Sequence, residues 1–235
     1  MTVFFDLDGT LLDDDAATRA GALAILQRRR AVFDLSDDAF IWRWKDLTTK
    51  HWRRYERGEV TFAEQRRARV IDLFRTAGRT LSAADADDLF QVYVRHYEQN
   101  WRSFPDVLPC LDALDGRSLG VISNGDPIQQ REKLERIGLL HRFTTVTISG
   151  AVGVSKPDPA IFQEACRRMR RTSRKCAYVG DRRSTDACAS ARAGLHGIWI
   201  DRSGASIAGA GGGIDTIHTL SELPYILGYH AGAHP

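Results

Sequence analysis

The chain has 235 residues, enough for one large domain or for a core domain with an insertion. Hydrophobic residues make up 43% and charged residues 27%, which is ordinary for a globular protein, and the formal net charge is +3. This charge gives no sign of a nucleic acid polymer or a membrane surface as partner. No uninterrupted apolar run is as long as the about 18 residues that a membrane-spanning helix needs.

The N-terminal segment MTVFFDLDGT contains two aspartates and no basic region, so it lacks the pattern of a signal peptide. The four cysteines have neither CxxC spacing nor neighbouring histidine pairs that would indicate a zinc site. We therefore expect a cytoplasmic protein whose cysteines are reduced and mostly buried.

The first predicted strand covers residues 3–7, an apolar run of β-formers that ends at Asp8-Gly9-Thr10. Residues 16–97 are then predicted to be almost wholly helical. Helices are expected at about 16–30, from an N-cap at Ser36 to Gly58, from a capping box of Thr61 and Glu64 to Gly78, and from Ser82 toward Tyr97.

After Pro105 short strands alternate with helices. Strands are expected at 119–123, 144–149, 175–180 and 197–200, and helices at 128–137, 159–171 and 184–193. This alternation predicts an α/β fold with a doubly wound parallel sheet, formed by residues 1–15 and 98–235, into which the helical segment 16–97 is inserted. The glycine-rich segment 203–213 lacks the phosphate-loop pattern and is predicted to be a solvent loop.

Chemically distinctive residues follow four of these strands, and in an open α/β sheet such loops converge at one edge. Asp6 and Asp8 are two positions apart, so their carboxylates point to the same side of an extended chain. One carboxylate can attack phosphorus while the other exchanges a proton with the leaving group. Alone, the pair also fits a polar strand end with a capping aspartate.

The other three features are individually weaker. Ser123-Asn124-Gly125 offers a hydroxyl and backbone N–H groups to a phosphate oxygen, although it also fits an ordinary turn. Lys156 precedes a proline, which keeps it out of the following helix, and its ammonium could neutralise a phosphoryl group; a surface lysine is the alternative. Asp181 and Asp186 could complete an oxygen-ligand set for Mg²⁺, or cap a helix.

In this order, the segments DLDGT, SNG, GVSKPDPAIF and VGDRRSTD resemble the four motifs of the haloacid dehalogenase (HAD) superfamily. The resemblance implies a Rossmann-like core with an all-helical C1 cap inserted after the first strand. It also implies an enzyme, a Mg²⁺-dependent phosphatase that works through an aspartyl-phosphate. Arg182-Arg183 and Ala189-Ser190 depart from the common motif, but neither departure removes a catalytic group.

The resemblance assigns the metal and proton chemistry to four acids. Asp6 is the nucleophile and a metal ligand, and Asp8 is the general acid and base, binding Mg²⁺ through its backbone carbonyl. Asp181 is the third protein ligand of the metal. Asp186 matches a further acidic position and is expected to support the ligands rather than to bind the ion.

Three residues are assigned to the phosphate by the same resemblance. Ser123 and Asn124 hold the phosphoryl group. Lys156 orients both Asp6 and the phosphate, so it counts as catalytic as well as phosphate-binding.

Alternatives on the same fold are a dehalogenase, a phosphonatase and a phosphomutase. Asp8 disfavours the dehalogenase, because dehalogenases lack an acid there and a halide leaves without a proton. A phosphonatase needs a Schiff-base lysine in its cap, and nothing marks Lys45 or Lys50 as one. The sequence does not decide whether the intermediate survives water, as a mutase requires. A non-catalytic phosphate-binding or regulatory protein is disfavoured because every motif acid is present.

The expected partner is a small phosphate ester, acted on by a monomer or small homo-oligomer. Residues 123–139 resemble members that act on nucleoside monophosphates or on sugar phosphates such as N-acylneuraminate 9-phosphate. Specificity is expected from the cap. Its aromatic residues Trp42, Trp44, Trp52 and Tyr55 are predicted to be mainly cap core, with stacking on a base as the alternative.

Overall fold

The computed structural model describes residues 1–205 and 213–231 and divides into two compact units. One unit is formed by residues 1–13 and by the chain from Arg102 onward, and the other by Asp14–Trp101. The expected insertion was 16–97; the helical unit reaches slightly further at both ends, because its first helix begins at Asp14 and its last ends at Gln99.

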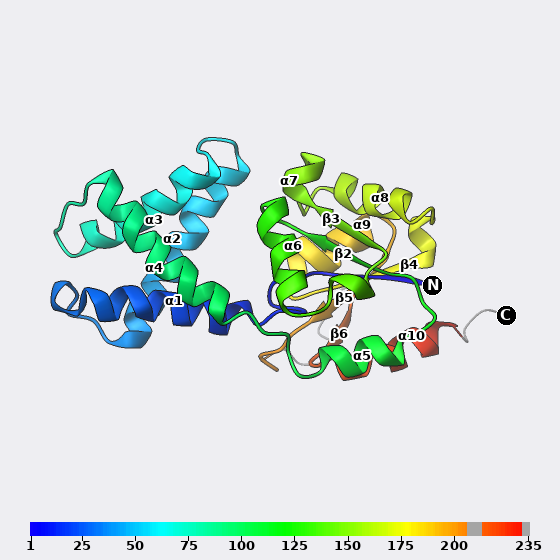
Figure 1. Cartoon of the computed structure of the whole chain (residues 1–235). Helices are drawn as coiled ribbons and strands as arrows, with labels where there is room; N and C mark the ends of the chain where they lie inside the picture. The colour runs from blue at the N-terminus through cyan, green and yellow to red at the C-terminus, as the bar shows by residue number, and fades with distance from the viewer. Residues whose placement is uncertain (206–212, 232–235) are drawn as a thin grey trace. The chain divides into compact units, whose positions relative to one another are not determined.

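The helical unit contains four long α-helices (Figure 1): α1 (Asp14–Arg28), α2 (Asp37–Glu56), α3 (Phe62–Thr76) and α4 (Ala83–Gln99), with a 3₁₀ turn, η1, at Arg30–Val32. The three predicted N-caps are present. The side chains of Ser36, Thr61 and Ser82 each accept a hydrogen bond from the backbone N–H three residues later, which satisfies a donor that the first helical turn leaves open.

Aromatic side chains fill the interior of the helical unit. Trp44 is fully buried and its ring centroid lies 4.7 Å from that of Tyr93. By contrast, Trp42 is 64% exposed, so the expectation that it belongs to the cap core is wrong. Two positions along a helix turn a side chain by about 200°, and burial of Trp44 therefore places Trp42 on the outer face.

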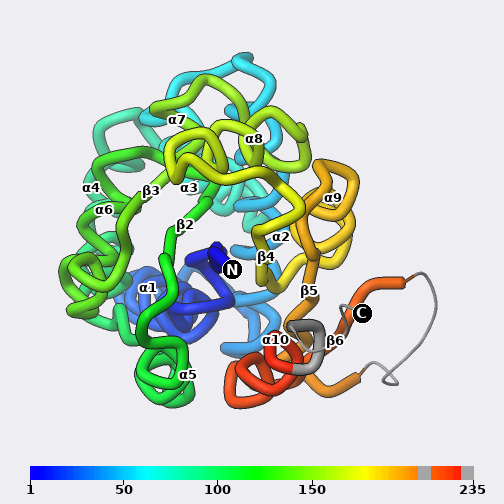
Figure 2. Tube along the Cα trace, turned by 90° about the vertical axis from the view of Figure 1, so that its right-hand side faces the viewer, coloured from blue at the N-terminus to red at the C-terminus, as the bar shows by residue number. Residues whose placement is uncertain are grey.

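The second unit is built on a six-stranded parallel sheet in the order β3-β2-β1-β4-β5-β6, which confirms the predicted Rossmann-like doubly wound core. The order can be followed across Figure 2, where the start of β1 lies between β2 and β4. The strands are β1 (Thr2–Phe5), β2 (Leu119–Ser123), β3 (Thr145–Ile148), β4 (Cys176–Gly180), β5 (His196–Ile200) and β6 (Asp215–Ile217).

Helices cover both faces of the sheet. On one face, Phe4, Ile122 and Tyr178 pack against Ile161 and Phe162. Figure 1 shows α5 and α10 together on the opposite face from α8 and α9. The α-helices of this unit are α5 (Val107–Ala113), α6 (Pro127–Arg136), α7 (Ser149–Val152), α8 (Pro159–Arg168), α9 (Cys188–Arg192) and α10 (Leu223–Ala231). Its 3₁₀ turns are η2 (Leu140–Arg142), η3 (Ser173–Lys175) and η5 (Leu220–Glu222).

Helix α5, strand β6, helix α10 and most of the short helix α7 are present where the sequence predicted no element. The helix expected at 184–193 is also divided, because residues Arg183–Ala187 form a π-helical turn, η4, before α9 begins at Cys188. Such wide turns are frequent at functional sites. Most of the predicted glycine-rich loop, residues 206–212, lies outside the described residues.

Of the four cysteines, Cys110, Cys166 and Cys176 are buried and Cys188 is partly buried; all four are free thiols, as expected. Among the helices within residues 1–205 and 213–231, none combines the length and the apolar character that crossing a membrane requires.

Candidate active site

The chain after β1 makes a tight turn at the carboxyl edge of the sheet. Asp6 is held there by its backbone N–H, which donates to the carbonyl of Val179 at 2.8 Å. Gly9 has φ +80°, and a Cβ on it would lie 2.5 Å from Oδ2 of Asp181. A glycine is therefore required at this position, and it brings the turn directly against Asp181.

Lys156 is the centre of a buried polar cluster. Its Nζ lies 2.7 Å from Oδ1 of Asp6, 2.7 Å from Oδ1 of Asp186 and 2.8 Å from the hydroxyl of Tyr178. All three ammonium protons can thus be used. Burial opposes the charge of Lys156, but Asp186 and Asp6 together raise the pKa of its ammonium above the ordinary value. Lys156 is a buried cation and not the surface lysine that the isolated motif allowed.

Asn124 fixes the backbone of Lys156. The Oδ1 atom of Asn124 accepts from the N–H of Lys156 at 2.8 Å, and its Nδ2 donates to the carbonyl of Lys156 at 3.0 Å. These paired contacts join the loop after β2 to the segment before α8. In this arrangement the Asn124 side chain positions the lysine.

Three carboxylates meet beside Lys156: one oxygen of each of Asp6, Asp181 and Asp186 lies within 4.8 Å of the others. Burial raises the pKa of Asp6 well above its ordinary value, since the opposing charge of Lys156 is offset by Asp186 and Asp181. Burial and the charge of Asp186 likewise raise the pKa of Asp181 to about 6. One more positive charge would relieve this repulsion.

The same cluster fits a divalent cation with oxygen ligands. Oδ1 of Asp181 is buried and has no hydrogen-bond partner among residues 1–205 and 213–231, and a bound metal ion would satisfy this atom. Both oxygens of Asp186 are already used: Oδ1 contacts Lys156 and Tyr178, and Oδ2 accepts from the N–H of Arg182 at 2.9 Å. This makes Asp6 and Asp181 better placed than Asp186 to hold the ion.

Asp8 is held by two residues that the sequence analysis missed, Gln130 and Lys133 of α6. Nε2 of Gln130 donates to Oδ2 of Asp8 at 2.8 Å and to Oγ of Ser123 at 2.7 Å. Nζ of Lys133 lies 2.7 Å from Oδ1 of Asp8. One signal was available, because positions 130, 133 and 134 form one helical face, and Leu134 marks that face as buried.

Every residue assigned to the site by its motif therefore lies in one continuous network, formed by the chain after β1, β2 and β4 and by the segment before α8. A family model for haloacid dehalogenase-like hydrolases matches residues 1–194. The chain belongs to this family. Lys45 and Lys50, considered for a HAD phosphonatase, form exposed ion pairs with Asp15 and Asp72 on the helical unit.

Relatives over most of the chain are HAD phosphatases. Phosphoserine phosphatase of Thermus thermophilus is 30% identical over 223 residues, covering 85% of this chain and 88% of that protein. Human N-acylneuraminate-9-phosphatase is 28% identical over 222 residues, covering 86% and 83%. These matches confirm the predicted superfamily and its phosphatase branch.

The solved structure of the HAD-hydrolase YfnB from Bacillus subtilis, bound to magnesium, shares the fold. Its TM-score is 0.78 with 24% identity, over 96% of this chain and 97% of that one. The HAD fold places catalytic groups at the carboxyl ends of the strands.

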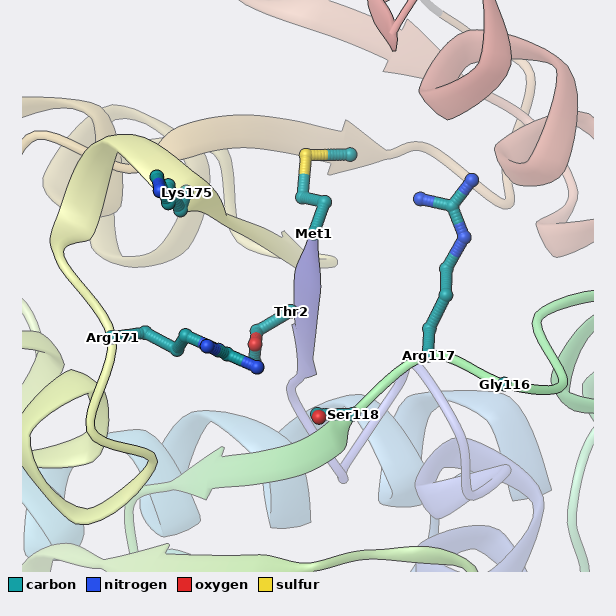
Figure 3. A pocket seen from close by; sticks show the side chains of 7 residues that line it. All are labelled: Met1, Thr2, Gly116, Arg117, Ser118, Arg171 and Lys175. Atoms are coloured by element: carbon teal, nitrogen blue, oxygen red, sulfur yellow. The ribbon is translucent and has the colours of Figure 1, made fainter.

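A separate pocket lies at the other end of the sheet, where β1, β2 and β4 begin (Figure 3). Its volume is about 280 Å³, and it is lined by Met1, Thr2, Gly116, Arg117, Ser118, Arg171 and Lys175. None of these lining residues carries a carboxylate, and none belongs to the HAD motifs. The pocket is distinct from the network around Asp6.

Proposed function

We propose that this HAD-type enzyme is a Mg²⁺-dependent hydrolase that cleaves a small phosphomonoester through an aspartyl-phosphate on Asp6. The observation that carries the proposal is the buried contact of Asp6 with Lys156, beside the unpartnered oxygen of Asp181. A nucleophilic carboxylate, a fixed cation and a metal position are the groups that phosphoryl transfer by an acid residue requires.

In the first step, a carboxylate oxygen of Asp6 bonds to phosphorus as the bond from phosphorus to the alkoxide oxygen breaks. Lys156 holds the carboxylate in one orientation and balances the charge that gathers on the phosphoryl oxygens. Asp8 gives its proton to the departing alkoxide. The hydroxyl of Ser123 and backbone N–H groups of the Ser123–Gly125 turn are proposed to hold the phosphoryl oxygens.

In the second step, a water molecule attacks the phosphorus of the aspartyl-phosphate and Asp8 takes its proton. The bond between phosphorus and the Asp6 oxygen breaks, so Asp6 returns to a carboxylate and phosphate is released. Mg²⁺ held by Asp6, Asp181 and the backbone carbonyl of Asp8 would supply positive charge at the phosphoryl group. Asp186, through its contact with Lys156, keeps the ammonium in place.

The helical unit, residues 14–101, is proposed to act as the cap that excludes water and selects the substrate. Phosphoserine and N-acylneuraminate 9-phosphate, the substrates in the names of the relatives, are the first candidates. Both combine a phosphomonoester with a small polar body.

The test is phosphate release from a panel of natural phosphate esters with Mg²⁺, for the wild type and for Asp6→Asn. The wild type should turn over at least one ester, and Asp6→Asn should lose turnover while keeping its fold. Full turnover by Asp6→Asn would overturn the mechanism. Transfer of the phosphoryl group to a second hydroxyl, without free phosphate, would favour a mutase; chloride release from 2-chloropropionate would favour a dehalogenase.

A further inference from the structure

We infer that Lys133 and Gln130 of α6 are positioning residues that set the Asp8 carboxylate for proton transfer. The inference deepens the proposed function and rests on it. Neither residue belongs to the motifs that identify the family, and neither contacts Asp6 in the described network.

The contacts use the whole carboxylate of Asp8. Lys133 reaches Oδ1 and Gln130 reaches Oδ2, at 2.7 and 2.8 Å. A carboxylate with a donor on each oxygen is fixed both in position and in rotation about its terminal bond. Asp8 therefore points in one direction, although its side chain is 29% exposed.

Burial shows that these contacts are built into the helix. Lys133 is 3% exposed and Gln130 is 2% exposed, on the same inner face as Leu134. Burying an ammonium or an amide is unfavourable unless the group finds partners, and Asp8 supplies a partner to both. Two apolar side chains would pack on this face without needing hydrogen-bond partners. The presence of Lys133 and Gln130 is therefore better explained by their contacts with the Asp8 carboxylate.

Gln130 also links the two halves of the site. The two hydrogens of its amide go to Asp8 and to Oγ of Ser123, so the proton-transfer group and the phosphate-holding hydroxyl are held at a fixed separation. Gly125 permits this placement, because a Cβ there would lie 2.7 Å from Cγ of Gln130.

The consequence falls on proton transfer more than on nucleophilic attack. Asp8 must reach the oxygen of the leaving group as its bond to phosphorus breaks, and a misplaced acid slows that step. An alkoxide needs the proton in order to leave. A p-nitrophenolate ion leaves at neutral pH without one. Loss of Lys133 should therefore lower kcat/KM more for esters that release an alkoxide than for p-nitrophenyl phosphate.

The experiment compares benzyl phosphate with p-nitrophenyl phosphate. The two esters are similar in size, but only the benzyl alkoxide must be protonated in order to leave. The quantity is the ratio of their kcat/KM values, because kcat/KM reports the step in which the leaving group departs. For Lys133→Met, we expect kcat/KM on benzyl phosphate to fall about 10- to 100-fold, because a misplaced acid should lose only part of the about 10²- to 10⁴-fold that general acid catalysis contributes. The ratio should shift by about tenfold.

The matched control is Arg131→Met, which removes an exposed cation of the same helix. Arg131 is paired with Glu135 at 3.6 Å, and its loss should leave the ratio unchanged. The ratio does not depend on how much enzyme is folded, since that amount divides out. If Lys133→Met gives no folded protein, Lys133→Gln is measured in the same way and should shift the ratio in the same direction.

An unchanged ratio in a folded variant would overturn the inference and show that Lys133 serves packing alone. That result would leave the proposed function intact. Absence of phosphate release by the wild type from these probes and from the natural esters would instead overturn the proposed function, and the inference with it.

Discussion

The ammonium nitrogen of Lys156 lies 2.7 Å from Oδ1 of Asp6, and both side chains are nearly inaccessible to solvent. The two residues are 150 positions apart in the sequence. Because neither charge can be solvated by bulk water, each depends on the other and on Asp186 for its compensation.

Substitution of Lys156 by Met should therefore affect both turnover and stability. Removing one partner leaves Asp6 and Asp186 buried together without their cation, which should lower the free energy of unfolding by about 3–5 kcal/mol. We expect kcat to fall by about 10²–10³-fold, as for loss of a preorganised charge. Phosphate release and urea unfolding measure the two effects. Lys175→Met, at an exposed lysine, should change neither, and turnover of Lys156→Met within threefold of the wild type would contradict the prediction.

Asp181→Asn should weaken metal binding. The substitution removes a ligand charge next to Asp6 while keeping the shape of the side chain. The Mg²⁺ concentration for half-maximal activity should rise about tenfold or more, by analogy with the 10–100-fold effects of perturbing metal sites. A Mg²⁺ titration of phosphate release tests this, with Asp215→Asn as a control away from the cluster. Equal Mg²⁺ requirements of wild type and Asp181→Asn would exclude Asp181 as a ligand.

Gly9→Ala and Gly78→Ala form a matched pair. Both glycines have positive φ, +80° and +67°, so each alanine should lower stability by about 1 kcal/mol through its backbone alone. Only at Gly9 does the added Cβ meet Asp181, whereas nothing lies within 4 Å at Gly78. Gly9→Ala should therefore also lose most phosphate release. Similar activity of the two variants would show that the close approach to Asp181 is unimportant.

His51 predicts a pH dependence of stability. It is buried in the helical unit beside Asp72, and burial lowers the pKa of its imidazole below the ordinary value despite that contact. Between this lowered pKa and about 6.5, the unfolded chain binds a proton that the folded chain excludes. Stability from His51 should thus be lost as the pH falls below about 6.5.

The measurement is urea unfolding of the full chain at pH 7.5 and at pH 5.5, for the wild type and for His51→Asn. The wild type should lose more stability between the two values than the variant does. His96→Asn, at an exposed histidine of the same unit, should follow the wild type. A larger loss in His51→Asn than in the wild type would reverse the sign and refute the prediction.

Local signals carried most of what could be predicted from the sequence. The strand ends at Asp6, Ser123 and Asp181 were recognisable because an apolar run of β-formers stops at a polar residue. The helical N-caps at Ser36, Thr61 and Ser82 were equally local. In contrast, β6 has only three residues, and such a strand forms because β5 offers a partner rather than from its own propensity.

Lys133 illustrates what remained hidden. It contacts a residue 125 positions away, and its neighbours in the sequence give it the character of a solvated helix lysine. The hydrogen bonds of Asn124 to the backbone of Lys156 could not be predicted from the sequence either, because they depend on how two distant loops are aligned. Motifs therefore indicated which residues are candidates for the chemistry, but not which residues hold them in place.

The position of β1 between β2 and β4 has a consequence for biosynthesis. Asp6 and Asp8 leave the ribosome before the other residues of their network, yet the backbone N–H of Asp6 is held by Val179. Lys156, which pairs with the Asp6 carboxylate, and Asp181, which lies beside it, also come much later in the chain. A nascent chain should thus carry an inert DLDGT segment until residues 156–181 have been synthesised. The network around Asp6 can be assembled only after β4 has emerged.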